Sequence, residues 1–290
     1  MNHVTRLRGR LAERATRRLV SMPGCWDALT MLLVERAGFE AGFVSGAALS
    51  MAMLGRADLG LVPADRVVDT IALMRDASDL PLLVDGDTGF GNALTLQRFV
   101  RMLERAGASA VQIEDQTFPK RCGHMAGKQV VPLADAVGRV RAALDARGDM
   151  LVVARTDALS VEGLDSAIER AEAFLAEGAD AVFVEGPRTM DELETVTRRF
   201  AARVPLVHNL AAGGVTPTDD EVRLEALGVA VALHPLLLLG GLATSGADWL
   251  TRLAGDRSSA ALRGATGELH HLNDLTGAKA LLDQGAKYGC

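Results

Sequence analysis

Eight short apolar runs recur along this chain, and this alternation constrains the fold more than any other feature. The runs cover residues 19–22, 41–44, 80–84, 110–113, 150–154, 181–184, 205–207 and 229–233. Short uninterrupted apolar runs are typical of parallel strands that are buried on both faces. The segments between them repeat apolar residues at helical spacing, as in residues 93–106 and 163–177. Eight strands alternating with helices predict an α/β fold, a closed (β/α)8 barrel of the TIM type, in preference to a doubly wound sheet.

The length and composition favour one compact domain. The chain has 290 residues, of which 49% are hydrophobic and 23% charged. No linker, repeat or low-complexity tract interrupts it between Leu19 and Leu253. We therefore expect an N-terminal helix over residues 1–18, the barrel over 19–254 and a C-terminal helical tail over 255–290.

The charge pattern argues against nucleic acid and membranes as partners. The net charge is -6, and the basic residues are scattered, which is unlike the stripe that tracks nucleic acid. The locally basic stretch from Arg6 to Arg18 is interpreted as a charged amphipathic helix on the surface. The longest apolar run, residues 229–239, is shorter than the roughly twenty residues of a membrane span. No signal peptide is recognisable, so we expect a cytoplasmic protein.

Polar residues stand where the apolar runs stop. They are Ser45, Asp85, Asp87, Glu114, Arg155, Glu185 and Asn209. The carboxyl ends of parallel barrel strands open onto one face, where active sites of this fold are built. Each residue alone could equally be a helix cap or half of an ion pair. Together they predict one shared site.

The stretch EDQTFPKRCGHMAGK, residues 114–128, combines acids, cations, a thiol and an imidazole. Cys122 has Lys120, Arg121 and His124 beside it, an electropositive setting that lowers a thiol pKa and makes the group usable in catalysis. The alternative is a small buried core residue. The remaining cysteines, at positions 25 and 290, are assigned no function, and no disulfide framework is expected.

Three of the strand-end acids form a candidate metal site. Asp85 and Asp87 flank one glycine, and Glu114 follows the next predicted strand. Magnesium prefers such carboxylates and keeps waters and a substrate oxygen in its octahedron. Aspartates are also common in turns, so the pattern alone is a weak indication.

Five blocks of sequence carry a family resemblance. They are PKRCGH followed by GK, SGAALS from Ser45, VDGDTGFGN from Val84, ARTDA from Ala154 and FVEGP from Phe183. In order and spacing they resemble the isocitrate lyase and phosphoenolpyruvate mutase superfamily. Within it, the chain is most similar to short lyases that split 2,3-dimethylmalate, oxaloacetate or 2-methylisocitrate. The resemblance implies the same barrel and a homotetramer.

The resemblance also implies roles for individual residues. Mg²⁺, with Mn²⁺ as an alternative, would be held by Asp58, Asp85, Asp87 and Glu114. Cys122 would be the proton donor, with Lys120 and His124 tuning the thiol and holding its loop. Substrate would contact Ser45, Gly46, Ala47, Gly123, Arg155, Glu185 and Asn209. The general base stays unassigned.

We therefore expect a Mg²⁺-dependent lyase that cleaves a carbon–carbon bond of a small 2-hydroxy or 2-oxo dicarboxylate by retro-aldol or related chemistry. One alternative is a carboxyphosphonoenolpyruvate phosphonomutase, whose loop can carry the same PKRCGH sequence. Another is a barrel that binds carboxylates without catalysis.

Two departures from the resembled lyases bear on substrate and assembly. Ala212 stands where those lyases carry glutamate. The tail after Gly255 lacks their aromatic-rich helix, which leaves exchange of that segment between subunits open.

Overall fold

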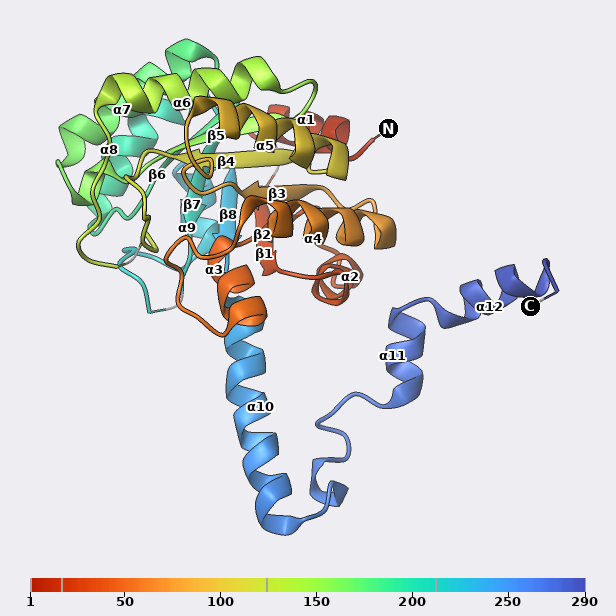
Figure 1. Cartoon of the computed structure of the whole chain (residues 1–290). Helices are drawn as coiled ribbons and strands as arrows, with labels where there is room; N and C mark the ends of the chain where they lie inside the picture. Colours follow the sequence, from red (N-terminus) through yellow and green to blue (C-terminus); the bar gives the residue numbers. More distant parts are fainter. Residues whose placement is uncertain (1, 17, 124, 212, 290) are drawn as a thin grey trace. The chain divides into compact units, whose positions relative to one another are not determined.

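The chain folds around a closed parallel barrel. The structure, a computed structural model, describes residues 2–16, 18–123, 125–211 and 213–289. The strands pair in sequence order, and the last one closes the sheet against the first (Figure 1). They are β1 (Val20–Cys25), β2 (Gly42–Val44), β3 (Leu82–Asp85), β4 (Ala110–Glu114), β5 (Leu151–Thr156), β6 (Ala181–Val184), β7 (Leu206–Asn209) and β8 (Val231–His234). Each predicted run corresponds to one strand, so the predicted (β/α)8 barrel is confirmed.

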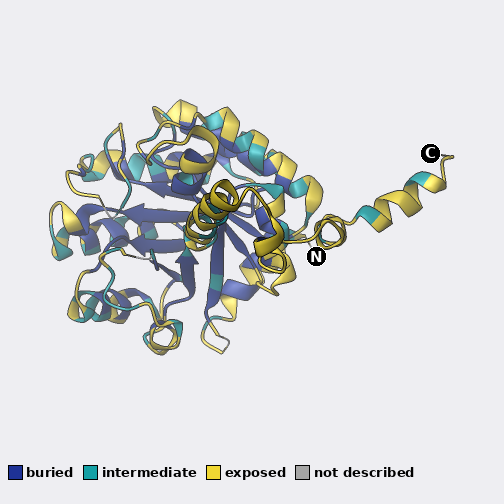
Figure 2. Ribbon diagram, turned by 90° about the horizontal axis from the view of Figure 1, so that it is seen from below, coloured by how far each residue is buried: buried dark blue, intermediate teal, exposed yellow. Residues whose placement is uncertain are grey.

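Helices surround the barrel and cover the strands, whose residues are nearly all buried (Figure 2). The main helices that follow strands β1 to β7 are α2 (Ala28–Arg36), α4 (Ala64–Ala77), α5 (Ala93–Ala106), α6 (Leu133–Ala146), α7 (Leu164–Glu177), α8 (Met190–Phe200) and α9 (Glu221–Ala226). Shorter turns are α3 (Gly46–Leu49), the π-helix η1 (Ser50–Leu54) and the 3-10 helix η2 (Ala158–Ser160). Helix α5 illustrates why these segments form: Asn92 caps its first amides, Leu96 and Phe99 face the core, and Gly107 ends it at φ 101°.

The N-terminal helix is amphipathic, as we expected, and Arg6 and Arg8 on its charged face are exposed. Helix α1 (His3–Ala12) buries Leu7 and Leu11 in the same apolar cluster as Val20 and Val231 of the barrel. A charged amphipathic pattern identifies an apolar stripe, but it does not say which surface that stripe packs on. The apolar face of the helix therefore extends the barrel core.

Strand register brings the polar strand ends together. In the ladder between β3 and β4, Asp85 pairs with Gln112, and between β4 and β5, Glu114 pairs with Arg155. Adjacent strands lie about 4.8 Å apart, so side chains paired in this way on one face are neighbours. The register thus sets acids and an arginine side by side at the carboxyl end of the barrel.

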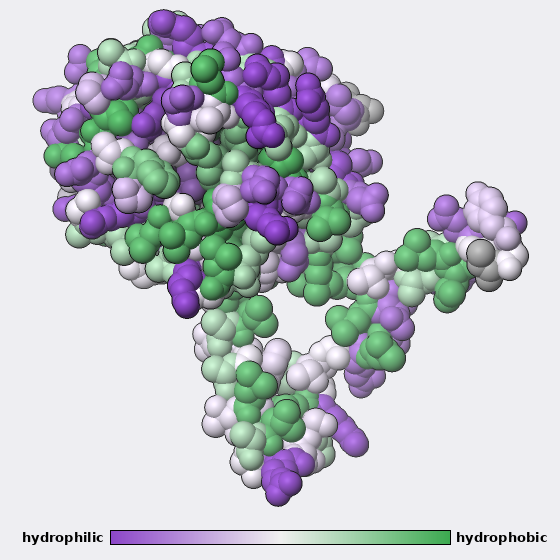
Figure 3. Space-filling model, in the orientation of Figure 1, coloured by the Kyte–Doolittle hydropathy of each residue, from purple (hydrophilic) through white to green (hydrophobic). Residues whose placement is uncertain are grey.

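The contacts within the chain divide it into Met1–Leu237 and Leu238–Cys290. The second unit holds most of α10 (Leu237–Asp256), the 3-10 helix η3 (Ala260–Leu262), α11 (Leu269–Leu275) and α12 (Ala278–Ala286). Among its described residues only Leu262 is buried, and Leu250, Leu269 and Leu282 are exposed. Figure 3 shows apolar patches on the surface of this unit. None of the described helices has the length and apolar character needed to span a membrane.

Candidate active site

A small cavity of about 40 Å³ opens at the carboxyl ends of the strands. Its wall contains ten of the residues predicted to form the site: Ser45, Ala47, Asp58, Asp85, Glu114, Lys120, Cys122, Gly123, Arg155 and Asn209. Segments that lie far apart in sequence therefore meet around one space. Phe43, Phe183 and Leu233 add an apolar wall, and Arg121 a further cation.

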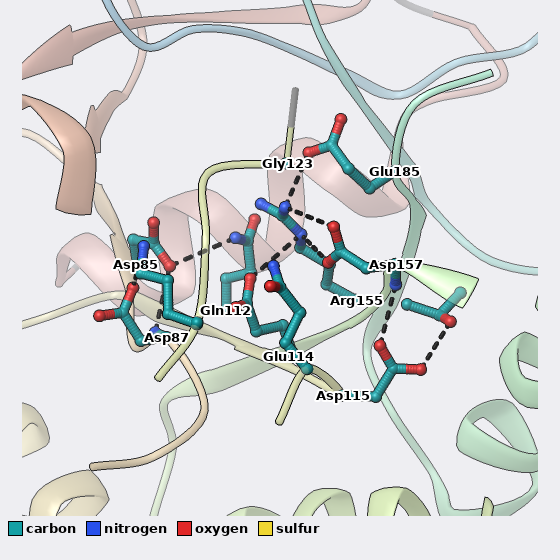
Figure 4. Close-up of polar contacts among 12 residues, drawn as sticks. Asp85, Asp87, Gln112, Glu114, Asp115, Gly123, Arg155, Asp157 and Glu185 are labelled. Carbon is teal, nitrogen blue, oxygen red and sulfur yellow. Dashed lines mark hydrogen bonds and ion pairs between the residues drawn. The ribbon is translucent and has the colours of Figure 1, made fainter. Parts of the chain in front are cut away.

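The end of β3 is built around Asp85. One carboxylate oxygen accepts a hydrogen bond from the backbone N–H of Gly46 at 3.3 Å. The other accepts from the backbone N–H of Asp87 at 3.1 Å and from the side-chain amide of Gln112 at 3.4 Å. Asp87 adopts φ 47°, a left-handed conformation that is unusual outside glycine. The two aspartates lie near one another at this turn (Figure 4), and Asp85 lines the cavity.

Lys120 lies between two of the predicted metal ligands. Its Nζ is 2.6 Å from Oδ1 of Asp58 and 2.7 Å from Oδ1 of Asp87, and only 3% of the side chain is exposed. Burial raises the pKa of Asp87 to about 7, although the attraction of Lys120 opposes this. Burial would lower the pKa of Lys120, but the carboxylates of Asp87, Asp85 and Asp58 outweigh it and hold that pKa well above its ordinary value. Lys120 thus contacts acids, whereas we expected it to tune the thiol.

Arg155 is the centre of a second buried network (Figure 4). Its Nε lies 2.9 Å from Oδ2 of Asp157 and 3.3 Å from Oε2 of Glu114, and its Nη2 lies 3.1 Å from Oε2 of Glu185. Burial raises the pKa of Glu114 well above its usual range, and the nearby Arg155 only partly offsets this. Arg155 also lines the cavity, where a guanidinium group can bind a carboxylate.

Acids outnumber cations in this buried region, which is the arrangement that fits a divalent ion. The acids are Asp58, Asp85, Asp87, Glu114, Asp157 and Glu185, and the cations are Lys120, Lys128 and Arg155. Oε1 of Glu114 is buried without a hydrogen-bond partner among the described residues. Uncompensated buried charge is costly, so an added cation would stabilise the site.

The carboxylates are not preassembled around a single point. Within the described residues, no three Asp, Glu, His or Cys side chains are grouped closely enough to hold a metal by themselves. Mg²⁺ commonly uses one or two carboxylates and fills its octahedron with water and substrate, so the acids present suit it.

Cys122 lies in the wall of the cavity, half-buried and outside any disulfide. Gly123 follows it and presses against Arg155 and Glu185: a Cβ added there would be 2.5 Å from Nη2 of Arg155. Cys25, in contrast, is fully buried, and burial raises the pKa of its thiol. The predicted loop residue His124 and the substituted Ala212 lie outside the residues that the structure describes.

The predicted anion-binding backbone at Ser45 is partly occupied. The Ser45 hydroxyl caps α3 by accepting from the backbone N–H of Ala48 at 3.3 Å, and the N–H of Gly46 is used by Asp85. Ser45 and Ala47 still face the cavity. Asn209 donates a hydrogen bond of 3.4 Å to Oε2 of Glu185. The substrate-binding roles of these residues stay predictions.

Sequence analysis missed four buried polar residues that support this site. Asp157 fixes Arg155, Gln112 binds Asp85, and Gln116 and Lys128 bind the loop that carries Cys122. The signal for Asp157 was present, because residues two apart at a strand end share a face. Nothing in the local sequence indicates the other three, since their partners lie on separate segments.

Active sites of parallel barrels lie at the carboxyl ends of the strands, so the carboxylates, arginine and thiol that gather there form a candidate active site. The family model described as phosphoenolpyruvate phosphomutase matches residues 10–240. The chain therefore belongs to the phosphoenolpyruvate mutase and isocitrate lyase superfamily, as the five sequence blocks predicted.

Known relatives agree. The chain is 33% identical to 2,3-dimethylmalate lyase of Eubacterium barkeri over 290 residues, 99% of each protein. It is 43% identical to the chloroplastic carboxyvinyl-carboxyphosphonate phosphorylmutase of Arabidopsis thaliana over 227 residues, 76% of this chain and 66% of that protein. The solved structure of oxaloacetate acetylhydrolase with 3,3-difluorooxalacetate matches with a TM-score of 0.93 and 28% identity, over 99% of this chain and 97% of the other.

Proposed function

We propose that this protein is a Mg²⁺-dependent lyase that cleaves a carbon–carbon bond of a small 2-hydroxy or 2-oxo dicarboxylate. The observation that carries the proposal is the shared cavity, where buried acids exceed cations and where Cys122 and Arg155 both line the wall. Similarity over the full chain to a 2,3-dimethylmalate lyase supports it.

The metal-binding acids, Arg155 and Cys122 each have a part in the proposed reaction. Asp85, Asp87 and Glu114, with Asp58 beside them, would hold the ion, directly or through water. When bound, Mg²⁺ supplies the positive charge that stabilises the electron-rich fragment left by cleavage. The guanidinium group of Arg155 would bind one carboxylate of the substrate and orient the bond to be broken. The Cys122 thiol, in the wall of the same cavity, would give its proton to the carbon that loses its bonding partner.

The walls of the cavity favour a dicarboxylate that carries methyl groups. The aromatic rings of Phe43 and Phe183 and the side chain of Leu233 form one side of it. Methyl substituents gain about 0.8 kcal/mol for each carbon buried against such a wall. The cations of the cavity are partly neutralised by acids already, which disfavours a substrate with a third carboxylate. We therefore rank a 2,3-dimethylmalate type of substrate before oxaloacetate and 2-methylisocitrate.

A phosphonomutase acting on a carboxyphosphonoenolpyruvate is the second candidate. It is favoured by the 43% identity to the Arabidopsis thaliana phosphorylmutase. Arg155 and the carboxylate site would serve a phosphonate in the same way as a second carboxylate, so the cavity alone does not separate the two reactions.

A substrate panel tests the proposal. The purified protein is incubated with Mg²⁺ and 2,3-dimethylmalate, oxaloacetate, 2-methylisocitrate, isocitrate or a phosphonate, and release of an oxo acid is followed. We expect release from a dicarboxylate, and its loss with a chelator. Turnover of the phosphonate alone would support the mutase. No turnover by folded, Mg²⁺-supplied protein would leave a barrel that binds carboxylates.

We also infer a cytoplasmic homotetramer. The second unit supports self-association, because its described residues expose Leu242, Leu250, Leu281 and Tyr288 and bury almost nothing. Apolar surface of this extent is costly in water. Light scattering on a sizing column gives the mass directly, and a monomer of 30.6 kDa would contradict the inference.

A further inference from the structure

Cys122 lies in a segment whose geometry depends on side chains. Between the end of β4 at Glu114 and the start of α6 at Leu133, the described residues contain only one isolated bridge, from Gln116 to Val130. Backbone pairing closes the base of the loop, with Thr117 donating to the carbonyl of Gln129 at 2.8 Å. Nearer the thiol, the backbone N–H of Met125 donates to the carbonyl of Cys122 at 2.9 Å, and side chains add further restraints on both sides of the cysteine.

On the N-terminal side of the thiol, Gln116 holds the backbone of Arg121 in two places. The N–H of Arg121 donates to Oε1 of Gln116 at 3.0 Å, and Nε2 of Gln116 donates to the carbonyl of Arg121 at 2.8 Å. Gln116 is 1% exposed, so these bonds are shielded from water. One side-chain amide thus pairs with a peptide unit on each side of the same residue, as a neighbouring strand would.

On the C-terminal side, Lys128 holds the backbone of Gly123. Its Nζ donates to the carbonyl of Gly123 at 2.6 Å and to Oδ1 of Asp157 at 2.7 Å. The side chain of Lys128 is 3% exposed, and Asp157 is fully buried. Asp157 also holds Arg155 through two of its nitrogens. Lys128 therefore links the loop to the network that orients Arg155.

We propose that Gln116 and Lys128 are positioning residues that clamp the backbone on both sides of Cys122 and so set its thiol within the cavity. The role in catalysis rests on the proposed lyase function. The restraint of the loop does not rest on that function, because it concerns only the position of the Cys122 thiol. Neither residue touches the reacting atoms in this view; Gln116 acts through the carbonyl and N–H of Arg121, and Lys128 acts through the carbonyl of Gly123.

The clamp makes a prediction about the thiol itself. Loss of either side chain frees one side of the cysteine backbone, so the thiol leaves the cavity more often and meets reagents in solution. Because both side chains restrain the position of the Cys122 thiol, loss of the second side chain should change the exposure of the thiol less than loss of the first. Their effects should therefore be non-additive.

The test measures alkylation of Cys122 by iodoacetamide without substrate, in a Cys290→Ser background. Cys25 is fully buried and does not compete. The variants are Gln116→Met, Lys128→Met and the double variant. Matched controls are Gln97→Met, on α5, and Lys279→Met, whose side chain is 85% exposed. We expect Gln116→Met and Lys128→Met to react at least about tenfold faster than the parent, the double variant to react little faster than either, and the controls to be unchanged.

Rates within twofold of the parent in both folded single variants would overturn the clamp. Folding is checked by thermal unfolding and near-ultraviolet circular dichroism. If Lys128→Met does not fold, the alkylation rate of Gln116→Met still tests the clamp, because this substitution removes no charge from the buried network. Lys128→Arg, which keeps a donor, should return the alkylation rate toward that of the parent.

Activity supplies a separate readout. With a dicarboxylate that the protein cleaves, the clamp variants should lower kcat by about 10- to 100-fold with little change in KM, because displacement of a catalytic group by about 1 Å costs about that much. If the parent cleaves no dicarboxylate, the proposed function fails, and the alkylation rates still decide the clamp.

Discussion

The ammonium group of Lys120 lies 2.7 Å from Oδ1 of Asp87, a carboxylate that we propose as a metal ligand. The same nitrogen also binds Asp58, so one buried cation holds acids from two separate loops. A lysine in this place supplies part of the positive charge that the acids require, and it links the Cys122 loop to the end of β3.

Replacement of this lysine should therefore make the protein depend more on a divalent ion. In Lys120→Met, Asp58 and Asp87 lose their buried partner, and we expect the free energy of unfolding to fall by about 3 kcal/mol. Added Mg²⁺ should raise Tm more in this variant than in the parent, because the ion replaces the lost charge. Differential scanning fluorimetry with and without Mg²⁺ measures this, with Lys279→Met as control. An equal or smaller rise in Lys120→Met would contradict the assignment of the acids.

The thiol should matter for turnover more than for binding. Cys122→Ser retains a similar volume but is a far weaker acid, so kcat should fall by about 10² to 10³ while KM changes little. Steady-state kinetics on the substrate found in the panel measures both. Cys25→Ala is the matched control, because that cysteine is outside the cavity wall and fully buried. Undiminished kcat in Cys122→Ser would exclude the proton-donor role.

The close approach of Gly123 to Arg155 leaves no room for a side chain. A Cβ there would lie 2.5 Å from Nη2 of Arg155 and 2.7 Å from the carboxylate of Glu185, so Gly123→Ala must displace the loop or the arginine. We expect kcat/KM to fall at least about tenfold.

Gly138→Ala provides the control for that substitution. Gly138 lies within α6 with nothing within 4 Å of an added Cβ, so alanine should leave activity unchanged and raise the free energy of unfolding by about 0.5–1 kcal/mol. Equal activity in the two variants would show that the packing at Gly123 is dispensable.

Asp157 gives a pH dependence with a defined sign. Burial opposes its ionisation, but Arg155 and Lys128 outweigh burial and lower the pKa of Asp157 from 3.8 to about 2. A depressed carboxyl pKa stabilises the folded state above pH 3.8, and that contribution is lost as the pH falls through about 2.

The stability difference between the parent and Asp157→Asn should therefore shrink by about 1 kcal/mol from pH 7 to pH 3. Urea unfolding at both pH values measures it. A difference that is constant, or larger at pH 3, would contradict the assigned ion pairs.

The barrel was predictable because its signal is local. Each buried parallel strand is a short and mostly apolar run with a polar residue at its carboxyl end, so the positions of Asp85, Glu114 and Arg155 at strand ends followed from topology. The partners of these side chains were not predictable in the same way. That Lys120 binds Asp58 and Asp87 depends on how a loop without regular structure folds back over the sheet.

The other unpredicted contacts have the same physical origin. The apolar stripe of α1 was visible, but the surface on which it packs is formed by strands more than one hundred residues away, such as Leu151 and Val231. Likewise, nothing in the local sequence indicates that Lys128 contacts Gly123 and Asp157. Sequence spacing identifies elements and their faces, whereas pairing between distant loops requires coordinates.

Helix α1 has one more consequence for turnover. Leu7 and Leu11 pack with Leu151 and Val231 at the end of the barrel opposite the cavity, so among the described residues apolar side chains close that end. If the proposed cleavage takes place in the cavity, both fragments leave through the same opening, and the deeper fragment leaves last. That fragment, added alone, should then act as a competitive inhibitor of the substrate.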